Sequence, residues 1–206
     1  MIVTTASKTQ TDLAVHARVV RAGIELVDRI DHADLTKPTP CADWTLHGLL
    51  THMIAQHYGF AAAARGAADP TVWKPRPLGP DPAAEYRAAA EHVLVAFAEP
   101  GVLAREFPLV EFGPDVRVPG AQAVGFHLVD YVVHAWDVAK TLDTTVDFDV
   151  AALAAAHAIA AAVPGGALRL APGAAFGPVV PWSDEITLDA IVARLGRVPG
   201  WSAATA

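Results

Sequence analysis

Residues 120–143 read GAQAVGFHLVDYVVHAWDVAKTLD, and this stretch decides the fold. Most of its side chains are apolar, and four polar ones recur about one turn apart: His127, Asp130, His134 and Asp137. Wrapped as a helix at about 100° per residue, these four fall within an arc of about 80°. Two imidazoles and two carboxylates on one buried helix face are unfavourable unless a partner compensates them. A divalent metal ion would be such a partner, which makes this face the first candidate for a functional site.

The composition is that of a folded, acidic protein. The chain has 206 residues, of which 53% are hydrophobic and 18% charged, enough for one substantial core. The net charge of −7 argues against nucleic acid as a partner, because no basic stripe exists to neutralise phosphates. The single cysteine, Cys41, is either a small buried residue or a reactive thiol at a helix start. Neither a signal peptide nor a membrane-spanning apolar run is evident, so we expect a cytoplasmic protein.

Apolar residues at helical spacing predict an all-α protein. Prolines, glycines and capping residues bound the periodic segments, and the predicted N-terminal caps are Thr11 or Asp12 for the first helix and Asp43 or Thr45 for the second. Four long helices of this kind predict a four-helix bundle over residues 1–165, with a short mixed appendage, residues 166–206, packed on it. The predicted helices cover residues 11–31, 45–66, 82–99, 120–141 and 148–163, and a shorter helix lies within 184–197.

Two connections are long. Residues 66–82 contain five prolines and predict a loop, either a solvated connector or a lid in which Trp73, Lys74 and Arg76 close over an anionic substrate. Residues 102–119 show short alternation and turn residues, which predicts a short hairpin or an extended crossover. We expect the connection from the third to the fourth helix to be the longest crossover. A parallel sheet is not expected, because strand–helix alternation and a glycine-rich phosphate loop are both absent from the sequence.

Asp130 and His134 stand four residues apart, so their side chains can share one ion. His52 is the candidate for a third ligand from another helix, because its neighbours on that face are small or polar and leave space beside the imidazole. Two imidazoles and one carboxylate suit zinc first, with nickel, iron(II) and manganese as alternatives. A structural interpretation stays open, since such residues also occur as hydrogen-bonded core groups. The neighbours of His52 are Thr45, Gly48, Gln56 and Gly59.

The remaining two residues of the stripe are expected to support the site. His127 is the predicted catalytic residue, moving a proton, with the alternatives of a fourth metal ligand or a hydrogen-bond donor behind the ligands. Asp137 is expected to hold the second ring nitrogen of His134, as carboxylates often do for metal-binding histidines. The alternative for Asp137 is a helix cap or a salt bridge elsewhere.

Three stretches of the chain resemble one known family. Residues 38–66, PTPCADWTLHGLLTHMIAQHYGFAAAARG, are similar to the second-helix signature of the DinB-like metal-binding superfamily. Residues 129–142, VDYVVHAWDVAKTL, look like the fourth-helix signature of its mycothiol-dependent maleylpyruvate isomerase N-terminal group. Residues 176–201, FGPVVPWSDEITLDAIVARLGRVPGW, resemble the ending of a compact actinobacterial subfamily of that group.

This resemblance implies a left-handed, up-and-down-type four-helix bundle with one long crossover and a metal at one end of its core. In that group a helix-2 histidine, a helix-4 carboxylate and a histidine four residues later bind the metal, and His52, Asp130 and His134 match them. The sequence departs from the group in two ways. The isomerase has Glu where this chain has Asp130, and its larger C-terminal domain supplies an active-site arginine, for which Arg169, Arg194 and Arg197 are available here.

The resemblance implies a metal-dependent enzyme that uses a low-molecular-weight thiol such as mycothiol in transfer or isomerisation of a small molecule. The alternatives are a metal-binding protein without thiol chemistry, hydrolase-like or stress-related, and a structural bundle with no catalysis. The expected partner is a small-molecule substrate, with neither nucleic acid nor a membrane. The Ala-rich segment 151–163 is either an intrachain packing element or the interface of a homodimer.

Overall fold

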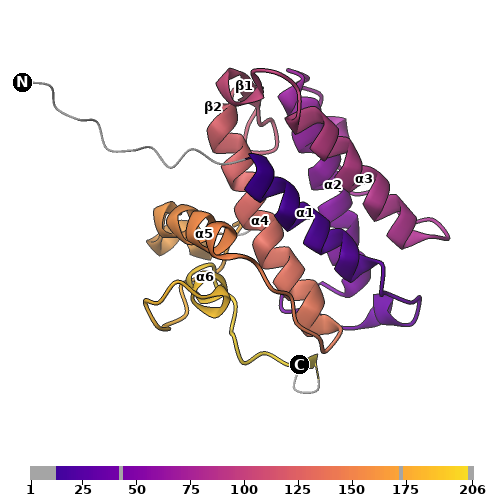
Figure 1. The fold of residues 1–206 in the computed structure, drawn as a ribbon, viewed down its shortest axis with the longest axis vertical. Coiled ribbons are helices and arrows are strands. Elements are labelled where there is room, and N and C mark those ends of the chain that lie inside the picture. The colour runs from indigo at the N-terminus through magenta and orange to yellow at the C-terminus, as the bar shows by residue number, and fades with distance from the viewer. Residues whose placement is uncertain (1–12, 42–43, 172–173, 204–206) are drawn as a thin grey trace, which may run out of the picture.

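The structure is a computed structural model that describes residues 13–41, 44–171 and 174–203. It is an all-α, DinB-like helix bundle with a short C-terminal appendage, as the sequence predicts (Figure 1). None of the described helices combines the length and the apolar character needed to cross a membrane. The helices are α1 (Leu13–Val27), α2 (Leu46–Ala64), α3 (Pro82–Phe97), α4 (Gly120–Thr141), α5 (Val150–Ala162) and α6 (Leu188–Arg194).

Local chemistry sets several helix ends. Asp81 caps α3 by accepting a hydrogen bond from the Ala84 amide, and Pro82 occupies the first helical position, where its missing N–H costs nothing. Asp149 caps α5 in the same way, and Thr187 caps α6. Thr45 precedes α2 without a side-chain cap bond. The other predicted caps, Thr11, Asp12 and Asp43, lie outside the described residues.

The four bundle helices surround the core so that α1 and α2 both contact α3 and α4. Helices α2 and α3 run parallel: Leu50 and Ala83 share one pocket near their starts, and Arg65 bonds Glu99 just beyond their ends. The segment that returns along the bundle is therefore the α2–α3 connection, residues 65–81. The expectation of a crossover between the third and fourth helices is wrong, because that longer connection stays at one end of the bundle and folds into a hairpin.

The hairpin pairs β1 (Glu106–Pro108) with β2 (Arg117–Pro119) in antiparallel register, with Phe107 opposite Val118. This confirms the hairpin alternative for residues 102–119. Gly120 follows β2 directly and begins α4 in a crowded position, where a Cβ would lie 2.2 Å from the Val102 carbonyl oxygen. Only glycine allows this close approach, which brings the start of α4 onto the hairpin.

The loop between α2 and α3 is anchored rather than free. A short 3₁₀ helix, Pro70–Trp73, buries the Trp73 indole against Phe60 with ring centroids 5.2 Å apart. Gly59 makes room for the indole, because a Cβ there would lie 2.3 Å from it. Trp73 is thus a core residue instead of part of a mobile lid, and only Lys74 and Arg76 of the expected trio are exposed.

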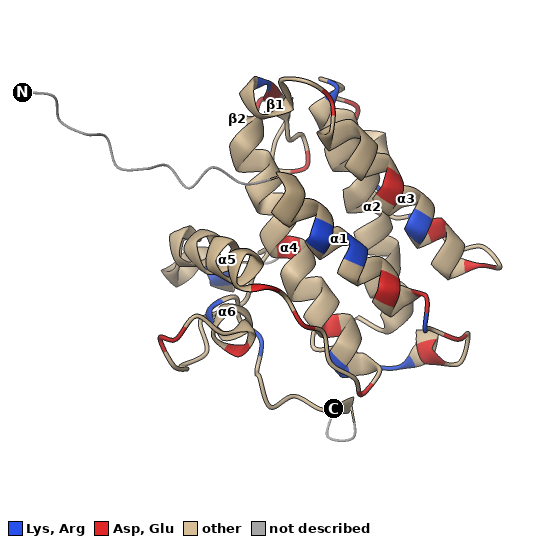
Figure 2. Ribbon diagram, viewed as in Figure 1, with Lys and Arg blue, Asp and Glu red and all other residues tan. Residues whose placement is uncertain are grey.

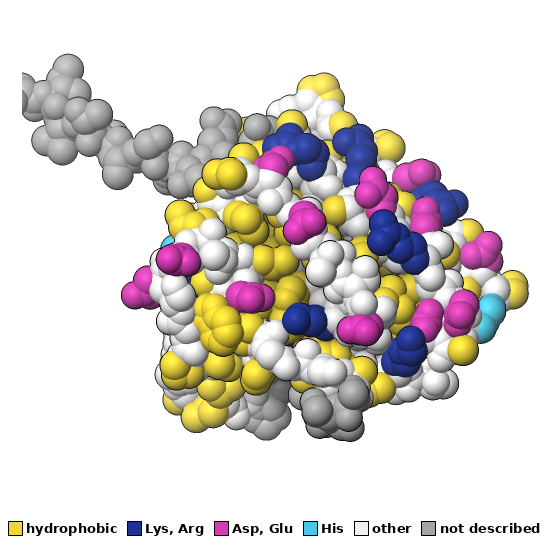
Figure 3. Space-filling view, turned by 60° about the horizontal axis from the view of Figure 1, so that its bottom comes forward, with side chains coloured by type: hydrophobic (Ala, Val, Ile, Leu, Met, Phe, Trp, Pro, Cys, Tyr) yellow, Lys and Arg dark blue, Asp and Glu magenta, His cyan; other side chains and the backbone are white. Residues whose placement is uncertain are grey.

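Helix α5 packs on α4 and α1, and the appendage packs on α5 and α4 through α6. Helix α5 carries no charged residue, whereas charges follow the exposed faces of α1 and α3 (Figure 2). The buried Arg169 ties the segment together by donating to four backbone carbonyls, those of Val163, Pro164, Gly177 and Arg194. Apolar side chains gather on this side of the molecule (Figure 3). The large exposed apolar residues from α5 to the C-terminal segment are Val150, Leu168, Leu170, Val179, Trp182, Ile186 and Val198.

Candidate metal centre

The three predicted ligands come together between α2 and α4. One ligand atom each of His52, Asp130 and His134 lies within 4.8 Å of the other two. The His134 Nε2 atom is 3.3 Å from Asp130 Oδ1, and the His52 and His134 rings meet edge to face with centroids 5.2 Å apart. The i, i+4 spacing on α4 and the small or polar neighbours of His52 on α2 bring this about. No other group of this kind occurs in the described part of the chain.

The donor set fits a divalent metal ion. Two imidazole nitrogens and one carboxylate oxygen are the ligands of many catalytic zinc and iron sites, and three protein ligands leave further positions open. His134 is buried, while His52 and Asp130 keep partial solvent contact. The site is therefore not sealed from solvent, which is consistent with a catalytic site.

The two histidines have opposite protonation tendencies. Burial and the nearby His134 lower the pKa of His52 to about 4, so this imidazole is neutral and ready to bind a metal. Burial also opposes charge on His134, but Asp130 and Asp137 outweigh it and raise the pKa of His134 to about 9. Without a metal, His134 therefore carries a proton at neutral pH, and an ion would take that proton's place.

A second layer of charges fixes His134. Asp137 Oδ2 lies 3.0 Å from His134 Nδ1, the contact expected from the sequence, which leaves Nε2 to face Asp130. Asp137 is fully buried and also receives hydrogen bonds from the Arg197 Nε and Nη2 atoms, each 3.0 Å from an oxygen. Burial alone would raise the pKa of Asp137, but Arg197 and His134 hold it below its ordinary value. Of the three arginines considered, Arg197 thus connects the C-terminal segment to a ligand.

Sequence reasoning missed a polar pair beside the ligands. Gln56, one turn beyond His52 on α2, donates from Nε2 to Glu111 Oε1 at 2.7 Å. Burial and the negative charge of Asp130 raise the pKa of Glu111, although the bond from Gln56 works against this. Gln56 is one of the polar neighbours of His52 that the sequence places on the same face of α2. Nothing in the sequence pointed to Glu111, because the hairpin turn that brings it there is 55 residues away along the chain.

His127 lies deeper in the bundle, fully buried. Its Nδ1 atom is 2.8 Å from His16 Nε2, and its Nε2 atom is 3.2 Å from His57 Nδ1. Both ring nitrogens thus contact other imidazoles, and any proton that His127 moves passes through His16 or His57. Its assignment as the catalytic residue stays a prediction. The interaction of His16 and His57 with His127 was not anticipated from the sequence.

The fold and the ligand geometry define a class, the metal-binding helix bundles of the DinB-like type, and comparison with known proteins gives the family. Residues 16–139 match the model of the mycothiol maleylpyruvate isomerase N-terminal domain, and the chain belongs to this family. It is similar to two uncharacterized proteins of Mycobacterium tuberculosis, one from strain CDC 1551 / Oshkosh and one from strain H37Rv. Each is 32% identical over 186 residues, which cover 90% of this chain and 97% of the relative.

Proposed function

We propose that this protein is a metal-dependent enzyme that uses a low-molecular-weight thiol of the mycothiol type in transfer or isomerisation of a small molecule. The observation that carries the proposal is the convergence of His52, Asp130 and His134 within 4.8 Å, with partial solvent access. The family, whose description includes mycothiol, supports the thiol. Zinc is the proposed metal, because two neutral imidazoles and a carboxylate suit it.

A bound divalent ion would lower the pKa of a coordinated thiol and so supply a thiolate nucleophile at neutral pH. The side chains around the ligands keep the ligands in place. Asp137 accepts a hydrogen bond from His134 Nδ1 and so keeps Nε2 free for ligation. Arg197 offsets the charge of Asp137, so that the buried carboxylate needs no proton. Both effects preserve one orientation of the ligands.

The proton released by a thiol needs an acceptor near the ligands. Glu111 is the proposed acceptor, since its raised pKa makes it a stronger base than an ordinary carboxylate and Gln56 holds one of its oxygens. His127 is the acceptor predicted from the sequence. A comparison of Glu111→Gln with His127→Phe separates the two: the variant that lowers the turnover number while leaving metal content unchanged marks the acceptor.

Metal content tests the site itself. Purified protein is expected to hold one zinc ion per chain, and the His52→Ala/His134→Ala double variant none, by elemental analysis. His47→Ala is the matched control, because His47 lies exposed on the same helix as His52. Absence of metal from the unmodified protein after incubation with zinc would overturn the proposal.

Thiol chemistry is tested separately with cobalt in place of zinc. Addition of mycothiol is expected to produce a thiolate-to-cobalt charge-transfer band in the near ultraviolet. An unchanged spectrum at saturating thiol would leave a metal site without thiol chemistry, hydrolase-like or stress-related, as the function. Analysis of the product formed from an electrophilic substrate in the presence of mycothiol then distinguishes transfer from isomerisation.

A further inference from the structure

A chain of three histidines runs across the core, apart from the proposed ligands. His16 on α1, His127 on α4 and His57 on α2 are all buried, and the nitrogen–nitrogen distances along the chain are 2.8 and 3.2 Å. Tyr131 stacks on both His57 and His127, with ring centroids 4.0 and 4.1 Å away. These aromatic contacts fix the planes of the imidazoles and so preserve the hydrogen-bonded arrangement.

All three imidazoles are neutral at physiological pH. Burial lowers the pKa of His16 to about 3, and it lowers those of His57 and His127 well below the ordinary value. A neutral imidazole has one N–H and one lone pair. The hydrogen bonds of the chain must therefore all point the same way, either from His16 toward His57 or from His57 toward His16.

The His57 end of this chain is incomplete. His57 Nε2 and the Tyr86 hydroxyl are both buried and have no hydrogen-bond partner among the described residues. Their rings meet edge to face with centroids 5.3 Å apart. A buried polar atom left unpaired is unfavourable, so two of them on adjoining rings point to a group that satisfies both.

The chemistry of the two atoms restricts what can bind there. When all three histidines are neutral, His57 Nε2 donates if the hydrogen bonds run from His16 to His57, and it accepts if they run the other way. The Tyr86 hydroxyl can do both. The ligand must therefore be neutral and able both to donate and to accept. Little room is available on the α1 side, since a Cβ at Gly23 would lie 2.7 Å from the Tyr86 oxygen. These conditions are met by a water molecule.

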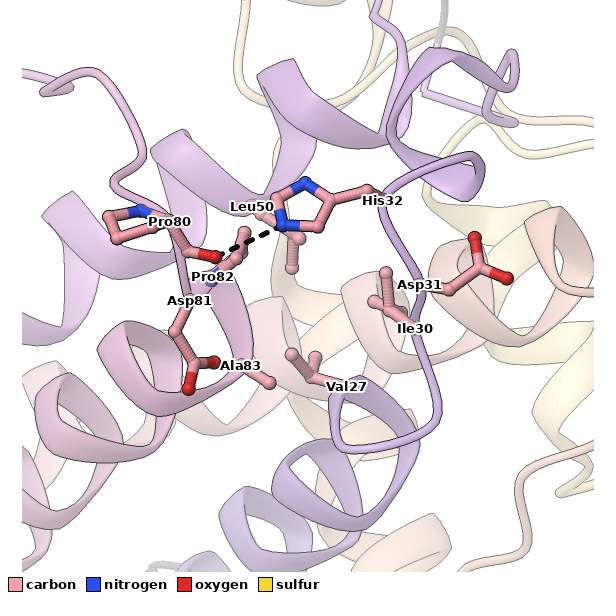
Figure 4. Close-up of a pocket in the computed structure, with 9 residues that line it drawn as sticks. All are labelled: Val27, Ile30, Asp31, His32, Leu50, Pro80, Asp81, Pro82 and Ala83. Atoms are coloured by element: carbon pink, nitrogen blue, oxygen red, sulfur yellow. Dashed lines mark hydrogen bonds between the residues drawn. The ribbon is translucent and has the colours of Figure 1, made fainter.

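A pocket of about 290 Å³ opens on the surface along α1, α2 and α3 (Figure 4). Its lining includes Val27 of α1 and Ala83 of α3, which lie one helical turn from Gly23 and Tyr86 respectively. Leu50 of α2, which also lines it, is two turns before His57. His32 borders the mouth, where its Nε2 atom contacts the Pro80 carbonyl at 3.0 Å. The pocket thus lies one to two helical turns from the residues that carry the unpaired atoms.

We propose that a single water molecule binds between His57 Nε2 and the Tyr86 hydroxyl, completes the His16–His127–His57 chain, and exchanges with solvent through this pocket. The site is separate from the metal centre and independent of the proposed thiol chemistry. It gives the closed core one hydrated position and connects a row of neutral imidazoles to bulk water.

Nuclear magnetic resonance of the full chain with ¹⁵N-labelled histidine tests the water site. We expect three neutral imidazoles and a nuclear Overhauser cross-peak from a long-lived water to His57, lost in Tyr86→Phe while the other histidine signals stay in place. A cross-peak missing from the unmodified protein, or unchanged in Tyr86→Phe, would overturn the proposal. So would a high-resolution crystal structure with a direct His57–Tyr86 hydrogen bond.

A plug variant tests the route. Ala83→Leu fills the pocket and is expected to slow exchange of the bound water by about tenfold, because a close-packed interior transmits water poorly. Ala88→Leu, on the exposed face of the same helix, is the matched control and should leave the exchange rate unchanged. Equal rates in the two variants would show that water enters by another path.

Discussion

Helices α2 and α4 each contribute to two groups of histidines that differ in their charged neighbours. His52 and His134 belong to the candidate metal centre, and His57 and His127 belong to the closed chain with His16. His134 and His16 are both buried, yet the pKa is raised to about 9 in His134 and lowered to about 3 in His16. The difference lies in the carboxylates: Asp130 and Asp137 flank His134, whereas aromatic rings surround the chain. Burial alone therefore does not decide what a core histidine can do.

The largest expected effect comes from removal of the charge that balances the metal centre. Arg197→Ala removes the permanently charged partner of the fully buried Asp137 and leaves it only the contact with His134, which should lower the free energy of unfolding by about 3–5 kcal/mol. Urea denaturation of the metal-free protein measures this. Arg194→Ala is the control, since the partner of Arg194 is the exposed Asp184, and it should leave the denaturation midpoint unchanged. Equal effects of the two variants would contradict the proposed balance.

Loss of the hydrogen bond behind the ligand has the next largest effect. Asp137→Asn should weaken zinc binding by about 10–100-fold, because His134 loses the charged acceptor that orients it and increases its basicity. Competition with a chelating dye measures the affinity. The double variant Asp137→Asn/Arg197→Met, in which no buried charge is unpaired, serves as the stability control. Full affinity in that double variant would mean that Asp137 acts only on stability.

A substitution in the histidine chain should leave the metal centre unaffected. His16→Leu removes one hydrogen bond and leaves His127 Nδ1 unpaired, which should cost about 1–3 kcal/mol of stability. Zinc affinity should stay within about twofold, because mutations at sites without shared partners act independently. Calorimetry of unfolding and the chelator assay measure the two quantities. A large loss of affinity would show that the two histidine groups are coupled.

The smallest predicted effect is the release of a proton when zinc binds. Since His134 has a pKa of about 9 without metal and His52 one of about 4, zinc binding near pH 6.5 should release about one proton, from His134. Affinity should rise with pH until about pH 9. In the metal-free protein, the raised pKa of His134 has the opposite effect. It contributes to the free energy of unfolding below about pH 6.5, and this contribution is lost as the pH rises toward 9. Calorimetry in buffers of different ionisation enthalpy gives the count, and zero released protons would contradict it.

Much of the fold could be predicted from the sequence, because apolar residues recur at helical spacing within each bundle helix. The same local logic found Asp130, His134 and the contact to Asp137, all within two turns of α4. It failed where distant segments meet. Because α2 and α3 run parallel, the crossover lies between these two helices and not between α3 and α4. Glu111 reaches Gln56 only because a hairpin folds back. Trp73 was expected in a solvated connector or a lid because residues 66–82 contain five prolines, whereas Gly59 and Phe60, earlier in the chain, provide its place in the core.

The contact of Arg197 with Asp137 has a thermodynamic consequence. Because Arg197 belongs to the C-terminal segment and Asp137 holds a ligand, whatever stabilises the ligands also favours docking of that segment. Linkage makes the relation reciprocal: the factor by which a docked segment tightens ion binding is the factor by which a bound ion tightens docking. Docking of the C-terminal segment and ion binding are thus thermodynamically coupled through Asp137.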